Sequence, residues 1–487
     1  MAVKLCGELV IRRIDALVLV LWFFVITVGA QAAFPIFLNF KPSWACGRHQ
    51  NFSQDCTVAA SCPQNLTFKM EFSSALAELN LLCGERRYYA SLISSVYFAG
   101  MLIGALAFGT LSDAIGRRLP AILALLLVLA GSLGVWQAWN WQALLLTRLL
   151  IGIGSSGSLT VCFTYVMEII PPNLRLFLRG FFNWGWGRML LTLVCYLLPY
   201  WRSAALAQLL FLLPPLLAFL FLLPESPTWL RTRRRPQQLM KALRRLEQLN
   251  GERLGLSKTL EAVSSGAVEE PRMGFRELLC NPGMAKVTLT LWMMWFAASL
   301  SSYANDLNSG TLAGGLYLNQ FLFSLFIGLS KIFVFGLDFV PHFSRRMLHL
   351  VSQAVVLACF VPIVILMLVG DSPAMAQSIT IISLVGTVWI EYTWDACYVC
   401  GAEVFPTQMR SVGLGSSSVF ARIGAIIAPN MVVLGELWRP SPYVAVSVVG
   451  LASLATSYAF LPETRGKELT KASLPTREQE PESISML

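Results

Sequence analysis

Long apolar runs dominate this chain of 487 residues and leave few folds open to it. A helix of about 20 apolar residues is long enough to cross the hydrocarbon core of a bilayer. Twelve such runs occur, six before a polar stretch and six after it, near residues 14–38, 90–110, 119–138, 143–167, 178–199, 204–223, 285–304, 316–336, 347–369, 376–399, 412–434 and 442–461. They predict an all-α membrane protein with twelve transmembrane helices in two six-helix halves. The first run lacks a signal-peptide cleavage site, so we expect it to be retained.

The composition excludes a soluble protein and offers no basis for catalysis. Only 13% of the residues are charged, about half the fraction found in soluble domains. The sequence has no zinc-type spacing of Cys and His, no Walker A motif and no nucleophile elbow. We therefore predict a protein that is not an enzyme and that binds no metal or cofactor.

The distribution of positive charge predicts the orientation in the membrane. The net charge is +10, and Lys and Arg gather in short loops that all fall on one side if both termini are cytoplasmic. The central stretch 231–286 adds twelve Lys or Arg against six Glu, partly on a basic amphipathic helix suited to lipid headgroups. The positive charge is thus a sign of topology and not of nucleic-acid binding.

This topology divides the chain into segments. We expect a cytoplasmic N-terminus, a first half, a cytoplasmic basic linker, a second half and a disordered cytoplasmic tail. Their residues are 1–13, 14–223, 224–284, 285–461 and 462–487, and the first half includes an extracellular loop at about 39–89.

The expected extracellular loop carries the marks of the secretory route. Asn51 and Asn65 each begin a glycosylation sequon. Four cysteines in the same loop predict two disulfides, with three pairings open: Cys46, Cys56, Cys62 and Cys83. We therefore expect a multi-pass glycoprotein of the plasma membrane.

The two halves repeat each other. "MEIIPPNLR" follows the fourth run and "AEVFPTQMR" follows the tenth, and Glu168 and Arg175 recur 235 residues later as Glu403 and Arg410. The pair Arg117–Arg118 has a counterpart at 345–346, and "LPES" after the sixth run returns as "LPET" after the twelfth. Several landmarks in register indicate a parallel duplication, which is one architecture of secondary transporters with a substrate site between the halves.

Ionisable residues inside the expected helices are the candidate site, because a charge in the bilayer centre is costly and usually has a partner or a ligand. Arg422 lies near the middle of its run; it could hold a solute anion or pair with Glu391 or Asp395, which share a helix face. Lys331 could face a cavity or snorkel to the headgroups. Arg188 is a further candidate charge partner, whereas Arg148 is expected to be structural.

The sequence also resembles a known family. "GTLSDAIGRRLPAIL" is similar to the signature loop of the major facilitator superfamily, and "LPESPTWLRTRRR", "AEVFPTQMRSVGLG", "FARIGAIIAP" and "LPETRGKEL" resemble solute carrier family 22, the organic cation, organic anion and carnitine transporters. The resemblance covers about residues 14–470. It implies a cytoplasmic conformational latch made of Asp113, Arg117, Arg118, Glu168, Arg175, Glu403 and Arg410.

The same resemblance points to the substrate. Arg422 and Lys331 stand where the anion-type members carry basic residues, and the aromatic positions of the family's cavity fall on Trp184, Tyr303, Trp394 and Tyr398. We therefore expect a transporter that moves organic anions or related amphipathic solutes across the bilayer by alternating access.

Several departures from the family pattern keep two alternatives open. Ser344 stands where a Gly precedes the second Arg pair, Arg188 replaces a usual Gln, and Glu391 with Asp395 is unfamiliar in anion-type members. One alternative is a cell-surface, receptor-like member with little or no transport. The other is a carrier of organic cations or zwitterions that uses the two carboxylates, which could also take up protons.

Overall fold

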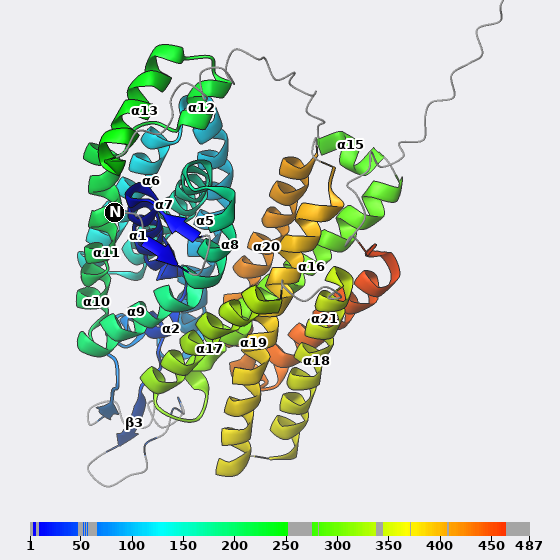
Figure 1. Cartoon of the computed structure of the whole chain (residues 1–487). Coiled ribbons are helices and arrows are strands. Elements are labelled where there is room, and N and C mark those ends of the chain that lie inside the picture. The colour runs from blue at the N-terminus through cyan, green and yellow to red at the C-terminus, as the bar shows by residue number, and fades with distance from the viewer. Residues whose placement is uncertain are drawn as a thin grey trace, which may run out of the picture.

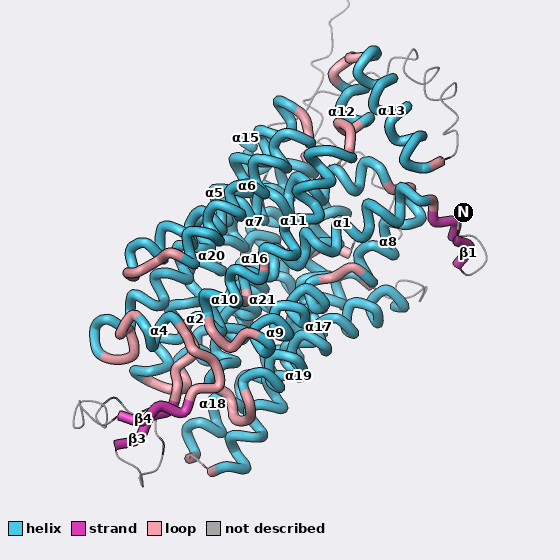
Figure 2. The backbone as a smooth tube through the Cα atoms, turned by 90° about the vertical axis from the view of Figure 1, so that its left-hand side faces the viewer, coloured by secondary structure: helices cyan, strands magenta, loops and turns pink. Residues whose placement is uncertain are grey.

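The computed structural model describes residues 3–463, apart from 6–8, 47–51, 53, 55, 57–65, 252–274, 281, 338–343, 371 and 407–408. Two bodies of helices lie beside each other, one built from the first half of the sequence and one from the second (Figure 1). A small sheet lies at one end, which we call the loop end, and the helices that join the two bodies lie at the other, the linker end (Figures 1 and 2).

The N-terminal half starts with a strand pair, β1 (Val3–Leu5) and β2 (Leu9–Ile11), and a second pair, β3 (Ser43–Cys46) and β4 (Leu66–Lys69), lies at the loop end. Its helices are α1 (Arg13–Gly29), α2 (Pro35–Leu38), α4 (Ala75–Glu78), α5 (Arg87–Ile115), α6 (Arg118–Trp136), α7 (Trp141–Ile169), α8 (Pro172–Phe181), α9 (Trp184–Leu197), α10 (Trp201–Ala207) and α11 (Leu209–Leu217).

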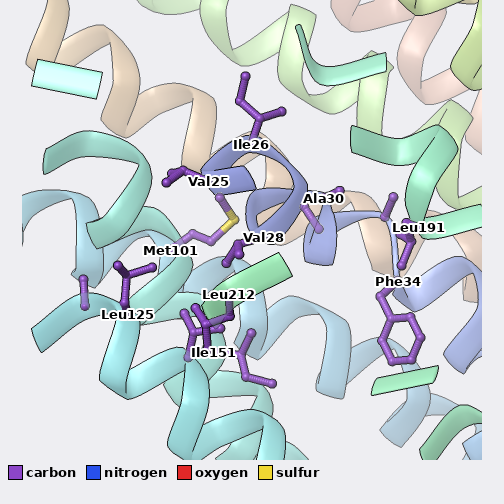
Figure 3. Close-up of a cluster of buried hydrophobic side chains, with 14 of the residues drawn as sticks. Val25, Ile26, Val28, Ala30, Phe34, Met101, Leu125, Ile151, Leu191 and Leu212 are labelled. Atoms are coloured by element: carbon purple, nitrogen blue, oxygen red, sulfur yellow. The ribbon is translucent and has the colours of Figure 1, made fainter. Parts of the chain in front are cut away.

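Small residues bring the helices of this half close together. At Gly152 of α7, an added Cβ would lie 2.1 Å from the Tyr97 carbonyl oxygen of α5, so these backbones approach as closely as glycine permits. Figure 3 shows the apolar core beside this contact, where Val25 and Val28 of α1, Met101 of α5 and Leu125 of α6 point toward one another.

Three short helices follow at the linker end: α12 (Pro227–Thr232), α13 (Pro236–Asn250) and α15 (Phe275–Cys280). The C-terminal half then contains α16 (Pro282–Asn308), α17 (Leu316–Leu337), α18 (Arg345–Val369), α19 (Pro373–Val404), α20 (Arg410–Leu437) and α21 (Ser441–Phe460). The α13 helix buries Leu239, Ala242 and Leu246, as its amphipathic pattern predicts, and exposes its basic side chains.

Ten helical segments of the described chain are long and apolar enough to cross a membrane: Arg13–Leu38, Arg87–Ile115, Arg118–Trp136, Trp141–Ile169, Trp201–Leu222, Leu316–Phe333, Arg345–Val369, Pro373–Val404, Arg410–Leu437 and Ser441–Phe460. The two other expected runs also form helices of the bundle. Run 178–199 is broken at Asn183, which caps α9 by accepting from Gly185 N. Run 285–304 forms α16, whose serines, Asn305 and Asp306 make it less apolar.

The predicted internal repeat is visible as a shared contact in both halves. Glu225 accepts hydrogen bonds from the backbone N–H groups of Arg117 (2.6 Å) and Arg118 (3.2 Å) at the start of α6. Glu463 does the same for Arg345 (3.1 Å) and Arg346 (3.3 Å) at the start of α18. The acids of "LPES" and "LPET" therefore satisfy free helix N–H groups at equivalent places.

Candidate functional site

Arg422 lies on α20 and is half-buried. Its Nη1 contacts Met101 Sδ of the other half at 3.8 Å, and no described carboxylate pairs with it. The guanidinium lies close enough to the phenols of Tyr303 and Tyr398 to interact with them electrostatically. The predicted ion pair of Arg422 with Glu391 or Asp395 is not among the described contacts, because both acids bind another cation.

That cation is Lys331 of α17, which lies between two carboxylates of α19. Its Nζ is 2.8 Å from Glu391 Oε2 and 3.0 Å from Asp395 Oδ2, and it also donates to the Glu391 carbonyl oxygen at 3.1 Å. The three side chains are 10–16% exposed. Lys331 therefore does not snorkel to the headgroups, and we call these residues the Lys331 triad.

Two further arginines are fixed by neighbours within the bundle. Arg188 of α9 forms an ion pair with Asp306 of α16 at 2.8 Å. Arg148 is fully buried, donates to Gln31 Oε1 at 3.0 Å and stacks over Tyr97 at 4.4 Å, in line with its expected structural role. Asp306 lies two residues beyond the end predicted for its run, so sequence reasoning missed it.

With Asp306 included, the central charges are four cations and three carboxylates. Arg188 is matched by Asp306, and the Lys331 triad carries one negative charge in excess. Of these cations, Arg422 and Arg148 have no described carboxylate partner, and Arg148 is enclosed by Gln31 and Tyr97. Arg422 is therefore the central cation that can still take an anionic ligand.

Aromatic side chains surround these charges. Trp394 and Tyr398 lie 6.0 Å apart and both pack on Trp295, a residue that sequence reasoning missed. Tyr303 packs on Phe98 of the other half at 4.6 Å. Tyr398 is 46% exposed and lies under the guanidinium of Arg179 of α8, at 5.8 Å. Trp184 is half-buried and packs against the apolar core of the N-terminal half.

The halves bind each other toward the loop end. Arg87 pairs with Glu436 at 2.7 Å, and Ser95 donates to the Ile426 carbonyl oxygen at 2.9 Å. An added Cβ on Gly185 of α9 would lie 2.3 Å from Gly328 N of α17. The helices diverge toward the linker end (Figure 1).

The predicted latch residues lie at the linker end, and each ion pair described for them joins residues of the same half. Arg117 binds Asp113 (2.7 Å) and Glu168 (3.1 Å), and Arg345 binds Glu403 (3.5 Å). Burial lowers the pKa of Arg117, but the two carboxylates more than offset this and hold it above its ordinary value.

The remaining predicted latch residues have other contacts. Arg118 donates to the Phe219 and Leu220 carbonyl oxygens at 2.9 and 2.7 Å, and exposed Arg175 donates to the Met167 carbonyl oxygen at 3.0 Å. Arg410 is half-buried at the start of α20. These three thus show no ion pair between halves among the described contacts.

One of the two predicted disulfides is present in the described chain. Cys56 and Cys83 are joined, which settles one pairing among those left open. Cys62 and the side chain of Cys46 lie outside the described residues, as do the expected glycosylation sites Asn51 and Asn65.

These features define a membrane transporter: two helical halves that meet at one end, with charges and aromatic rings at their interface. Residues 49–474 match the "Sugar (and other) transporter" family, and the chain belongs to this family of the major facilitator superfamily. It is 31% identical to mouse solute carrier family 22 member 7, over 87% of this chain and 77% of that protein. The family-22 relatives confirm the resemblance read from the sequence motifs.

Two other comparisons agree. An uncharacterized protein of Caenorhabditis elegans is 37% identical, over 94% of both chains. The solved structure of the xylose transporter XylE from E. coli, in its inward open conformation, superposes with a TM-score of 0.66 at 16% identity, over 94% of this chain and 97% of that one. This last likeness supports the transporter fold.

Proposed function

We propose that the protein carries organic anions, and the observation that supports this is Arg422, which has no carboxylate partner among the described residues. A guanidinium offers a planar pair of donors that matches a carboxylate or sulfonate. Tyr303, Tyr398 and Trp394 supply apolar ring surface beside it, which suits a solute with an aromatic or aliphatic body. Arg148 and Arg188 are already bound by neighbours, so they do not compete for the ligand.

Transport is proposed to proceed by alternating access. The contacts between α5 and α20 and between α9 and α17 close the loop end, and their release would open it while the latch residues of the two halves come together. We place both termini and the linker in the cytoplasm of a twelve-helix plasma-membrane protein, because Lys and Arg gather on that side.

Uptake of 1-naphthalenesulfonate into cells that express the chain tests the proposal. We expect Arg422→Ala to lower affinity by about 10- to 100-fold, the effect of losing charge-assisted hydrogen bonds, and Arg422→Lys to retain part of it. Arg244→Ala, on the exposed face of α13, is the matched control for loss of an arginine. Unchanged uptake in Arg422→Ala at equal surface expression contradicts the assignment.

A second candidate function rests on the Lys331 triad. Its excess negative charge suits an ammonium group, so a zwitterion could place its anionic end at Arg422 and its cationic end at Glu391. Uptake of a labelled quaternary ammonium or a zwitterion, with no uptake of the sulfonate, would favour this candidate. Absence of any uptake at normal surface expression would favour the receptor-like alternative.

A further inference from the structure

The Lys331 triad carries more charge than its own ion pairs neutralise. One ammonium group lies between two carboxylates, and all three are largely shielded from solvent by α17 and α19. A net charge inside a membrane helix bundle is costly unless a nearby charge or a bound ion compensates it. The triad therefore needs one further positive charge in its neighbourhood.

Arg422 supplies that charge through shared neighbours. Tyr303 interacts electrostatically with both Arg422 and Glu391, and Tyr398 interacts with Arg422, Lys331 and the solvent-exposed Arg179. The Arg422 guanidinium and the triad thus have the same two phenols as neighbours. Before a ligand binds, the positive charge of Arg422 and the negative charge of the triad balance each other across the site.

An anion on Arg422 upsets this balance. Once a carboxylate or sulfonate neutralises the guanidinium, the triad is left with its uncompensated negative charge. Uptake of one proton by Glu391 or Asp395 removes it. Binding of the anion then favours binding of the proton, and by linkage the proton favours the anion to the same extent.

A separate observation concerns a buried hydrogen-bond acceptor on Asn305, a residue that contacts Thr387 of α19. Asn305 of α16 is 4% exposed, and its Nδ2 donates to Thr387 Oγ1 at 2.8 Å. Thr387 lies one helical turn before Glu391, on the same face of α19. The Oδ1 atom of Asn305 is buried and has no described partner. A buried acceptor without a donor is costly, and a protonated carboxyl is the form of Glu391 that can donate.

We propose that the Lys331 triad is a proton-binding site that couples anion transport to a proton gradient. The proposal rests on the proposed anion function and adds the coupling ion. A proton from water on one side binds a carboxylate oxygen of Glu391 or Asp395, moves with the anion and is released to water on the other side. Lys331 keeps its charge throughout. The charged and titratable groups of the described helices around the triad are Tyr303 and Asp306 of α16, Tyr392, Cys397 and Tyr398 of α19, Arg422 of α20, Arg188 of α9 and Arg179 of α8, and the buried His349 lies on α18, which packs on α19.

Purified full-length protein in proteoliposomes tests the coupling. The probe is 1-naphthalenesulfonate, because a sulfonate stays ionised across the pH range and any pH effect then belongs to the protein. If one proton moves with each anion, we expect the sulfonate to accumulate inside the vesicles about tenfold for each pH unit by which the outside is more acidic than the inside. A pH dye should report proton uptake that accompanies sulfonate entry.

The Glu391→Gln variant separates coupling from binding. It leaves Lys331 with Asp395 alone and thereby mimics the protonated triad. We expect that sulfonate binding to this variant no longer depends on pH. The variant should still exchange sulfonate across the membrane in the absence of a pH gradient, but it should no longer accumulate sulfonate when a pH gradient is applied. Asp395→Asn should behave like Glu391→Gln. Lys331→Met should bind sulfonate more weakly at neutral pH, and binding should return to a higher affinity at acidic pH, where the carboxylates are protonated. Asp15→Asn, a buried ion-paired acid of α1, is the control for loss of a carboxylate.

Each outcome decides between the two proposals. Sulfonate movement that ignores the pH gradient and releases no proton signal overturns the coupling and leaves the anion function standing. A Glu391→Gln/Asp395→Asn double variant that still accumulates sulfonate overturns the triad as the site. Sulfonate that neither binds nor moves in the wild type overturns the anion function and the coupling with it.

Discussion

Gly104 lets two long helices of the N-terminal half touch backbone to backbone. An added Cβ at this position would lie 2.2 Å from the Ile153 carbonyl oxygen of α7. We expect Gly104→Ala to destabilise the protein by about 1–3 kcal/mol, because neither backbone can give way. Gly109→Ala on the same helix is the control, since its Cβ meets nothing within 4 Å. Thermal unfolding of the two variants in detergent should differ clearly; equal midpoints would contradict the close contact.

Glu78 predicts a pH dependence at the loop end. Partial burial raises its pKa, but hydrogen bonds from Arg202 (2.6 Å), Trp201 (2.6 Å) and Tyr200 (3.1 Å) outweigh this and hold the pKa below the ordinary 4.5. The bonds therefore stabilise the fold above 4.5 and are lost as the pH falls through the lowered pKa.

The matching measurement compares the wild type with Glu78→Gln. The variant should be less stable at neutral pH, and the difference in thermal midpoint should shrink as the pH falls below 4.5. A difference that stays constant with pH would mean that the charge of Glu78 is unimportant.

The interior arginines show where reasoning from the sequence ends at this scale. Their position inside the helix bundle follows from the apolar runs around them. Which one stays available depends on partners that are distant in sequence, such as Asp306, 118 residues from Arg188. Glu391 and Asp395 are the acids that the sequence suggested as partners of Arg422. They bind Lys331 instead, because α17 packs on α19.

At the level of helices, equivalent acids cap α6 and α18. Glu225 and Glu463 each accept two backbone N–H groups at a helix start, where the helix dipole also favours a negative charge. We expect Glu225→Ala and Glu463→Ala to cost about 1 kcal/mol each, with Gln in between because it keeps an acceptor. Thermal unfolding of the single and double variants tests this; a cost in one half alone would contradict the structural repeat.

The cap of α18 also explains why Ser344 replaces the Gly of the family pattern. Its hydroxyl accepts from Met347 N at 3.2 Å and bonds to Glu463, so a serine caps α18 directly. In the N-terminal half the equivalent turn uses Gly116, where φ is +114° and a Cβ would meet Glu225 Oε2 at 2.4 Å. The two halves reach the same cap by different turns, which a motif comparison registers as a mismatch.

Helix boundaries were predictable where the apolar pattern was continuous and failed where it was not. The runs of α5, α6, α7, α18 and α21 match their predicted positions to within several residues. The run at 178–199 instead divides into α8 and α9 at Asn183, whose Nδ2 donates to the Gly328 carbonyl oxygen of the other half at 3.2 Å. That break depends on a contact between halves, and no local pattern in the sequence reports it.

For the whole molecule, Gly185 limits how closely the two halves can approach where α9 crosses the middle of α17. It lies on α9 of one half, and its missing Cβ makes room for Gly328 N (2.3 Å) and the Ser324 carbonyl oxygen (2.6 Å) on α17 of the other. Gly185→Ala must push these helices apart. The substitution should destabilise only the conformation in which these helices touch, by about 1–3 kcal/mol. The equilibrium between conformations should therefore shift about 5- to 150-fold toward those with an open loop end.

Cysteine accessibility measures this shift directly, in a background with Cys6 and Cys280 replaced by serine. Tyr398→Cys reports the face toward the linker end, where that side chain is 46% exposed, and Ser91→Cys reports the loop-end contact with Asn430. Adding Gly185→Ala should slow maleimide labelling at 398 and speed it at 91, while Gly415→Ala, whose Cβ meets nothing within 4 Å, should change neither. Rates that stay the same at both positions would show that α9 and α17 are not the closing contact. A change at 91 alone would show that the two ends open independently, contrary to alternating access.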